Sequence, residues 1–165
     1  MGYDRAYPMT EAGICEIKIL PEGTILQSRS SGDYFSEDNG LFRRLFKTIQ
    51  ENRVPMSTPV EAGIRPGTMV FYLDADSAKR EDLKMVDGVT KTSVPERRVA
   101  SIGIRGGYSK KNFEEHVVKL RDWLGTKPGW KANGEPYAVY WNSPFTIWFL
   151  KRSEVHIPVR HDMER

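Results

Sequence analysis

The sequence predicts an α+β fold in which duplicated ββαββ units form a curved sheet or distorted barrel with two helices packed on it. Three observations lead to this prediction. Residues from about 36 to 51 have the apolar spacing of an amphipathic helix, and residues from about 109 to 124 repeat that pattern. Apolar segments of strand length flank both helices, and short motifs recur at one fixed offset.

Four strands are expected around the first helix. Residues 14–20 carry isoleucines ahead of Pro21-Glu22-Gly23, which predicts a strand that ends in a turn. Residues 24–30 are expected to form its hairpin partner. Beyond the helix, residues 59–65 and 68–74 are predicted to form two further strands. Ser36 is expected to cap the helix between the two pairs.

The strand at 68–74 is apolar on both faces. Met69 and Phe71 alternate with Val70 and Tyr72, so each face of the strand needs a cover. A helix is expected to cover one face and a ligand cleft the other. Met69 and Phe71 are therefore predicted to line the cleft.

The same pattern then recurs. Pro95-Glu96 follows Pro21-Glu22 by 74 residues, and Gly106-x-Tyr108 follows Gly32-x-Tyr34 by the same offset. A helix comes after each motif, the second with Ser109 as its expected cap. The matching offsets indicate an internal duplication.

Two more strands, at about 136–142 and 153–159, complete the second copy. The prediction is one domain over 14–159, made of repeats at about 14–74 and 84–159. Residues 1–13 and 160–165 are expected to be flexible termini.

Composition limits the class of protein. The hydrophobic fraction of 39% and the charged fraction of 28% are typical of a globular domain. A net charge of +3 without long basic blocks argues against a nucleic-acid partner. Cys15 is the single cysteine, which suits a reducing compartment, and no apolar run predicts a signal peptide or membrane span. A cytoplasmic protein with no membrane partner is expected.

Several motifs resemble those of the SOUL haem-binding protein family. Residues 41–46 and 54–60, Val-Pro-Met-Ser-Thr-Pro-Val, look like the family's helix and its Met-Thr-x-Pro-Val element. Residues 140–146 and 151–155 resemble its Tyr-Asn-x-Pro stretch and its Arg-x-Asn-Glu-Val ending. Here Trp141 is interposed, and Ser153 stands where the family has Asn. The fold is shared with gyrase-inhibitory proteins and multidrug effector-binding domains.

The resemblance implies a binding protein for haem or a related tetrapyrrole, with a small molecule as its partner and no catalytic role. It does not address the oligomeric state. A haem site needs an apolar slot, cations for two propionates and usually an axial ligand. Some family members hold tetrapyrroles mainly by apolar contact.

The last strand carries two candidate polar residues. Glu154 and His156 alternate with Val155 and Ile157, so they are expected on one face of the sheet. A carboxylate in that setting needs a partner. His156 is the best candidate for an iron ligand, although a hydrogen bond to Glu154 explains it equally well.

Other ligand-binding candidates belong to the segments that carry the resemblance. Met56 could contact a porphyrin or fill the core. Tyr140 and the aromatic side chains of Phe145 and Trp148 are expected to form a cleft wall. The cations that follow, Lys151 and Arg152, suit carboxylates such as propionates, although they could equally be a solvated pair.

Two other functions remain open. In effector-binding relatives a Glu at the position of Glu154 meets cationic ligands, which would make this protein a sensor or scavenger of amphipathic cations. Some proteins of the fold are hydrolases that use a cavity Glu, so Glu154 could instead act as a general base.

Overall fold

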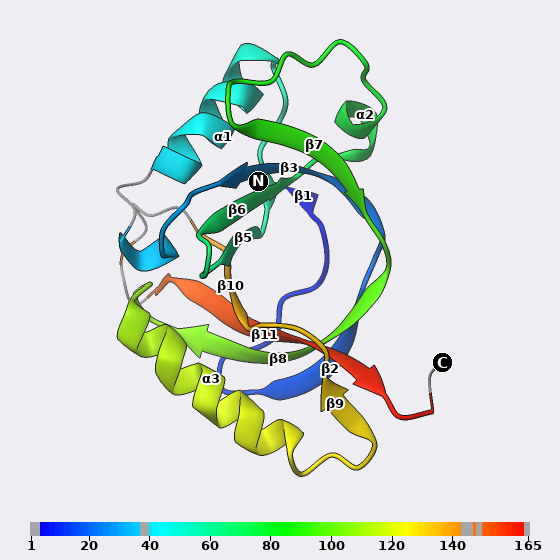
Figure 1. The fold of residues 1–165 in the computed structure, drawn as a ribbon, viewed down its shortest axis with the longest axis vertical. Coiled ribbons are helices and arrows are strands. Elements are labelled where there is room, and N and C mark those ends of the chain that lie inside the picture. The colour runs from blue at the N-terminus through cyan, green and yellow to red at the C-terminus, as the bar shows by residue number, and fades with distance from the viewer. Residues whose placement is uncertain (1–3, 37–39, 143–146, 148–149, 164–165) are drawn as a thin grey trace. The chain divides into compact units, whose positions relative to one another are not determined.

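The computed structural model describes residues 4–36, 40–142, 147 and 150–163. Its elements, in chain order, are β1 (Asp4–Arg5), β2 (Cys15–Leu20), β3 (Gly23–Arg29), the short 3-10 helix η1 (Tyr34–Ser36), α1 (Gly40–Glu51), β4 (Ser57–Thr58), β5 (Val60–Gly63), β6 (Thr68–Tyr72), α2 (Ala75–Ala78), β7 (Val89–Val94), β8 (Arg97–Arg105), α3 (Lys110–Leu124), β9 (Trp130–Ala132), β10 (Tyr137–Tyr140) and β11 (Arg152–His161). Figure 1 labels these elements on the ribbon, apart from η1 and β4. The α+β class predicted from the sequence is confirmed.

One compact unit, called unit 1, comprises the chain up to Tyr7 and Pro21–Pro95. Its strands lie in the order β5-β6-β3-β7, and each neighbouring pair is antiparallel. The apolar side of α1 packs on this sheet because its leucines recur at helical spacing. The core beneath the helix consists of Leu26, Leu41, Leu45, Ile49, Val54, Val60, Met69, Phe71 and Val89.

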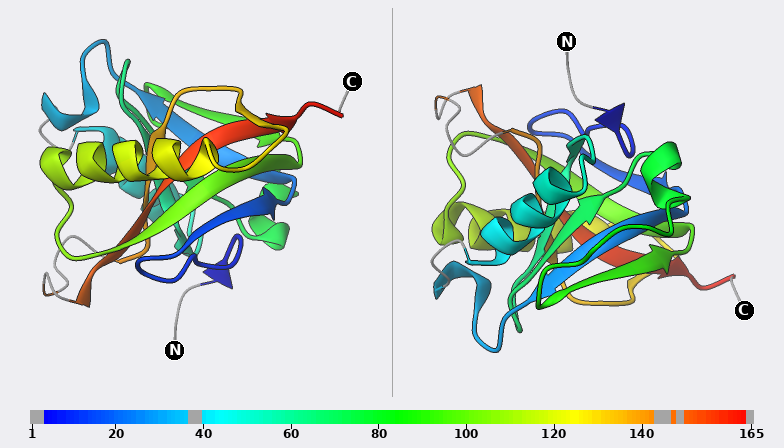
Figure 2. Two further views of the ribbon diagram at one scale, coloured as in Figure 1. Left: turned by 90° about the horizontal axis from the view of Figure 1, so that it is seen from below. Right: turned by 90° about the horizontal axis from the view of Figure 1, so that it is seen from above.

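The other compact unit, unit 2, comprises Pro8–Leu20 and the chain from Glu96 onward. Its strands lie in the order β10-β11-β8-β2, all antiparallel, and β9 pairs with the end of β11. The helix α3 packs on one face of this sheet, and Ser109 caps it by accepting a hydrogen bond from the Asn112 N–H. Figure 2 shows each long helix lying across the strands of its own unit. The core beneath α3 consists of Ala100, Ile102, Ile104, Leu120, Leu124, Val155, Ile157 and Val159.

The order of elements repeats along the chain, with β2-β3-α1-β5-β6 followed by β7-β8-α3-β10-β11. β7 begins 74 residues after β2, and β8 begins 74 residues after β3. The two compact units do not correspond to the two series of repeated elements. Unit 2 contains β2, the first strand of the first series, and unit 1 contains β7, the first strand of the second.

Two local predictions are wrong. The expected hairpin between β2 and β3 does not form, because β2 pairs with β8 while β3 pairs with β6 and β7. The chain instead passes at Pro21 from unit 2 into unit 1. Ser36 does not cap α1, which begins at Gly40; the Ser36 hydroxyl donates to the Asp33 carbonyl within η1.

Short elements were not anticipated. β1 and β4 form a small parallel pair, α2 is a single turn capped by Asp74, and β9 is a three-residue strand. Their few residues carry no clear periodicity, which is why local patterns miss them. In the described part of the chain, no helix has both the length and the apolar character needed to cross a membrane.

Packing of α3 can be tested with a matched pair of substitutions on the helix. Leu120 is fully buried, whereas Val118 is 59% exposed. We expect Leu120→Ala to lower the free energy of unfolding by about 2–5 kcal/mol because it leaves a cavity. Val118→Ala should change it by no more than about 0.5 kcal/mol. Urea unfolding measures both, and equal effects would contradict the packing of α3 described above.

Candidate functional site

A buried carboxylate lies at the centre of unit 2. Glu154 is on β11, and its side chain is on the sheet face opposite α3, because Val155 on the other face belongs to the core beneath that helix. Only 1% of Glu154 is exposed. Five donors surround the two oxygens: Lys18 Nζ (2.8 Å), Ser101 Oγ (2.9 Å) and His156 Nε2 (2.6 Å) on Oε1, and the Thr10 N–H (2.9 Å) and Trp141 Nε1 (2.5 Å) on Oε2.

These donors are positioned by strand register. Ser101 on β8 faces His156 across the β8–β11 pair, and Gly103 faces Glu154 itself. Lys18 on β2 faces Val99 on the next strand, which places its side chain on the same face. The carboxylate therefore depends on three strands held in one register.

The N-terminal segment of unit 2 covers this face. The Pro8 carbonyl accepts a hydrogen bond from Lys18 Nζ at 2.9 Å, and the Thr10 hydroxyl lies 2.8 Å from Ser101 Oγ. Gly103 permits the close approach, since a Cβ there would lie 2.1 Å from the Glu11 carbonyl oxygen. Any residue other than glycine at 103 would push the segment away.

The surroundings keep Glu154 ionised. Burial acts to raise the pKa of Glu154, but the hydrogen bond and charge of His156, together with the Lys18 ammonium, lower it from 4.5 to about 2. A general base works best with a pKa near the working pH. The geometry therefore disfavours Glu154 as a base for hydrolysis.

Both ring nitrogens of His156 are engaged. Because an ionised carboxylate only accepts hydrogen bonds, the hydrogen in the contact with Glu154 belongs to Nε2. Nδ1 lies 3.0 Å from the hydroxyl of Tyr137, and the ring is fully buried. His156 is held as a structural partner of Glu154 and offers no nitrogen to iron in this arrangement. Among the described residues, no group of three or more His, Cys, Asp or Glu side chains could hold a metal ion.

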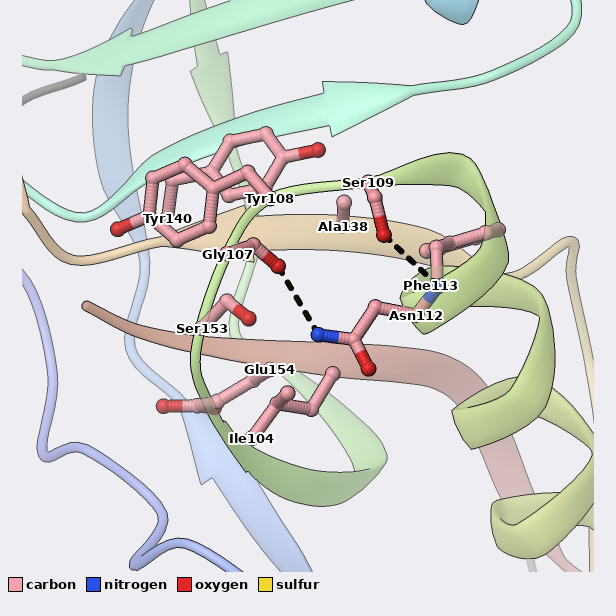
Figure 3. A pocket seen from close by; sticks show the side chains of 10 residues that line it. All are labelled: Ile104, Gly107, Tyr108, Ser109, Asn112, Phe113, Ala138, Tyr140, Ser153 and Glu154. Carbon is pink, nitrogen blue, oxygen red and sulfur yellow. Dashed lines mark hydrogen bonds between the residues drawn. The ribbon is translucent and has the colours of Figure 1, made fainter. Parts of the chain in front are cut away.

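A separate hollow lies at the first turn of α3, lined by Ile104, Gly107, Tyr108, Ser109, Asn112, Phe113, Ala138, Tyr140, Ser153 and Glu154. Its cavity volume is about 10 Å³, which is room for about one water molecule. The rings of Tyr108 and Tyr140 lie with centroids 4.3 Å apart, and Lys151 Nζ lies 4.7 Å from the Tyr108 centroid. Figure 3 shows the two rings at one end of the hollow and Asn112 at the other, with the Glu154 carboxylate pointing away from α3.

The loop beside this hollow is fixed by Tyr108. Its hydroxyl donates to the Arg152 carbonyl at 3.0 Å and accepts from the Asn142 N–H at 3.0 Å. Asn142 in turn accepts a hydrogen bond from the Arg152 N–H through Oδ1 at 2.7 Å. These bonds place half-buried Lys151 and Arg152 next to Tyr140.

The predicted site residues in unit 2 divide unevenly between the hollow and the buried cluster. Tyr140 lines the hollow, and Glu154 belongs both to its lining and to the buried cluster with His156. Lys151 contacts the Tyr108 ring, and neither Lys151 nor Arg152 lines the hollow. In unit 1, Met69 (6% exposed) and Phe71 (1% exposed) belong to the core beneath α1, and Met56 is half-buried against that core. Met69 and Phe71 were expected to line a cleft, but α1 packs on the face of the sheet that carries them. Phe145 and Trp148 lie outside the described residues.

Sequence reasoning missed four partners of Glu154: Thr10, Lys18, Ser101 and Trp141. A signal existed for two of them, since Lys18 and Ser101 are polar residues that alternate with apolar ones in strand segments. Nothing local indicates that these strands pair with β11.

Comparison with solved structures identifies the fold. The fold is that of effector-binding domains: the EcmrR C-terminal domain matches with a TM-score of 0.68 at 13% identity, covering 90% of this chain and 98% of that one. Against EcmrR in its complex with DNA, the TM-score is again 0.68 at 14% identity, and this chain spans 57% of that longer one.

Two further structures share the fold. A hydrolase from Listeria innocua matches with a TM-score of 0.62 at 14% identity, over 92% of this chain and 94% of that one. SAV2435 bound to tetraphenylphosphonium matches with a TM-score of 0.51 at 10% identity, over 89% and 94%. Identities this low establish the fold alone.

The family follows from the sequence. The model of the SOUL heme-binding protein family matches residues 6–158, so this chain belongs to that family. The resemblance seen in its motifs is confirmed. No curated protein matches the sequence.

The lowered pKa of Glu154 predicts acid-sensitive stability. The carboxylate stabilises the fold above its ordinary pKa of 4.5, and this contribution is lost as the pH falls toward about 2. We expect Glu154→Gln to lower the free energy of unfolding by an amount on the order of 3 kcal/mol near neutral pH, with the difference from wild type shrinking below about pH 4. Urea unfolding over a pH series measures this. The exposed Glu135→Gln is the control, and a pH-independent deficit in Glu154→Gln would contradict the prediction.

Proposed function

We propose that this protein binds a tetrapyrrole, with haem the first candidate, by apolar contact and without an iron bond from His156. The observation that carries the proposal is the match to the SOUL heme-binding protein family over residues 6–158. A cytoplasmic location, expected from the single cysteine, is part of the same proposal.

The group around the hollow supports it. Tyr108 and Tyr140 offer flat apolar rings with polar edges, which suits contact with a planar macrocycle. Lys151 lies against the Tyr108 ring and Arg152 follows it in the chain, so both would be near the carboxylates of a tetrapyrrole that contacted this ring. Aromatic faces beside cations provide the two kinds of contact that such a ligand needs.

The size of the hollow limits the mode of binding. Its cavity volume of about 10 Å³ is far below the ~300–1,000 Å³ of sites that bury most of a ligand. The macrocycle would therefore lie along the surface beside the two tyrosine rings and would not enter the hollow. The described residues thus fit a tetrapyrrole held by apolar contact, and they do not fit one held by His156. Bound haem would supply its own redox-active iron.

The two alternatives receive less support. An amphipathic cation, such as the tetraphenylphosphonium bound to SAV2435, would need a free carboxylate, and Glu154 is already surrounded by donors that include the Lys18 ammonium. A hydrolase would need a base that accepts a proton, which a Glu154 with a pKa of about 2 does poorly.

Titration of purified protein with haemin, followed at the Soret band, tests the proposal. We expect a saturable change at micromolar haemin. Replacing both Lys151 and Arg152 by Ala should weaken binding about 5-fold, because two partly solvent-screened charge contacts are lost. The Lys131→Ala variant, altered at an exposed lysine of β9, should bind like wild type.

The role of His156 is tested in the same assay. His156→Gln should keep the wild-type Soret position and an affinity within about 2-fold, once circular dichroism shows that it is folded. A shifted Soret band in this variant would mean that His156 ligates the iron. No saturable change with wild-type protein would refute tetrapyrrole binding altogether.

A further inference from the structure

The Glu154 carboxylate has no position left for an external cation. A carboxylate offers about four lone-pair sites, and five donors already crowd the two oxygens of Glu154. A ligand can therefore reach the carboxylate only by displacing one of these donors.

Lys18 is the donor that can leave. Ser101 and His156 are fully buried, Trp141 is only 5% exposed, and Thr10 donates from its backbone, so each of these donors is held by its packing or by the main chain. The Lys18 side chain is 11% exposed, and its long stem reaches from β2 to the edge of the cluster. Its ammonium also carries the full positive charge that a cationic ligand would bring.

The bonds of Lys18 are those that a bound ammonium would make. Nζ donates to Glu154 Oε1 at 2.8 Å and to the Pro8 carbonyl at 2.9 Å. One anionic and one neutral acceptor, both at ideal distance, form a small receptor for a primary ammonium group. Lys18 fills that receptor from within the chain.

We infer that Glu154 and the Pro8 carbonyl form a masked ammonium-binding site whose resident ligand is the tethered side chain of Lys18. The wild-type protein consequently rejects external primary ammonium ions at this position. Removal of the tethered ammonium opens the site to alkylammonium ions of matching length.

Tethering explains the rejection. Folding already holds the Lys18 ammonium oriented against Glu154, so its effective concentration there far exceeds any that a free amine reaches in solution. A free amine therefore does not displace Lys18. Once the side chain is shortened, Glu154 Oε1 and the Pro8 carbonyl lose the ammonium that they share, and a free ammonium gains by pairing with both.

Chemical rescue tests the inference. Lys18→Ala removes the three methylenes and the ammonium that n-propylammonium carries, so this ion is the matched probe. We expect Lys18→Ala to lower Tm by about 10 °C. Propylammonium at about ten times its dissociation constant should restore about 3–6 °C, while wild type should not respond.

Matched controls distinguish binding of the ammonium group to Glu154 from general effects of salt and solvent. Sodium chloride at equal ionic strength, the neutral isostere propan-1-ol and tetramethylammonium, which has no N–H, should leave Lys18→Ala unchanged. The Lys18→Ala/Glu154→Gln variant should not respond to propylammonium. Equal responses of wild type and Lys18→Ala, or of the single and double variants, would overturn the inference.

A second measurement covers the case in which Lys18→Ala does not fold. In wild-type protein, an amine-reactive reagent followed by mass spectrometry should modify Lys18 at least about 10-fold more slowly than Lys119, an exposed lysine of α3. Glu154→Gln should speed the modification of Lys18 and leave Lys119 unchanged. Equal rates at the two lysines in wild type would show that Lys18 does not occupy the site. Haemin is absent from both experiments, so their outcome is independent of tetrapyrrole binding.

Discussion

The ionised carboxylate of Glu154, buried on a strand of unit 2, imposes the constraint on which that unit depends. A buried charge is tolerated only when it is paired and fully hydrogen-bonded. Here the donors come from β2, β8, β11, the residue after β10 and the segment before β2. A one-residue slip of any of these strands would turn its donor toward α3 and leave the charge unsatisfied. The carboxylate therefore specifies register as well as adding stability.

The same constraint links distant parts of the chain. Thr10 and Lys18 lie 144 and 136 residues before Glu154, and the whole of Pro21–Pro95 intervenes. Unit 2 is thus discontinuous in sequence, because its edge strand β2 comes before Pro21 and its other strands come after Pro95. Contacts of such long separation form late because loop closure must come first. Completion of unit 2 requires both ends of the chain.

The arrangement also bears on ligand charge. In a fold whose members include a protein bound to an organic cation, this chain places its own ammonium against the buried Glu154. Lys151 lies instead against Tyr108, a residue that lines the hollow at the start of α3. The tetrapyrrole proposed above, with carboxylates and a flat apolar body, would match this distribution better than a cation would.

The sequence by itself determined the elements that depend on local pattern. The amphipathic spacing around Leu45 and Leu120 predicted both long helices, Ser109 marked the start of α3, and the 74-residue offset revealed the repetition, because each signal lies within one segment or its copy. Alternation on β11 also placed Glu154 and His156 on one face. Only the tertiary structure decided that β2 pairs with β8 rather than β3, that α1 covers Met69 and Phe71, and that Lys18 reaches Glu154. Strand pairing and charge satisfaction arise between residues far apart in the chain, and no local periodicity encodes which partner each will meet.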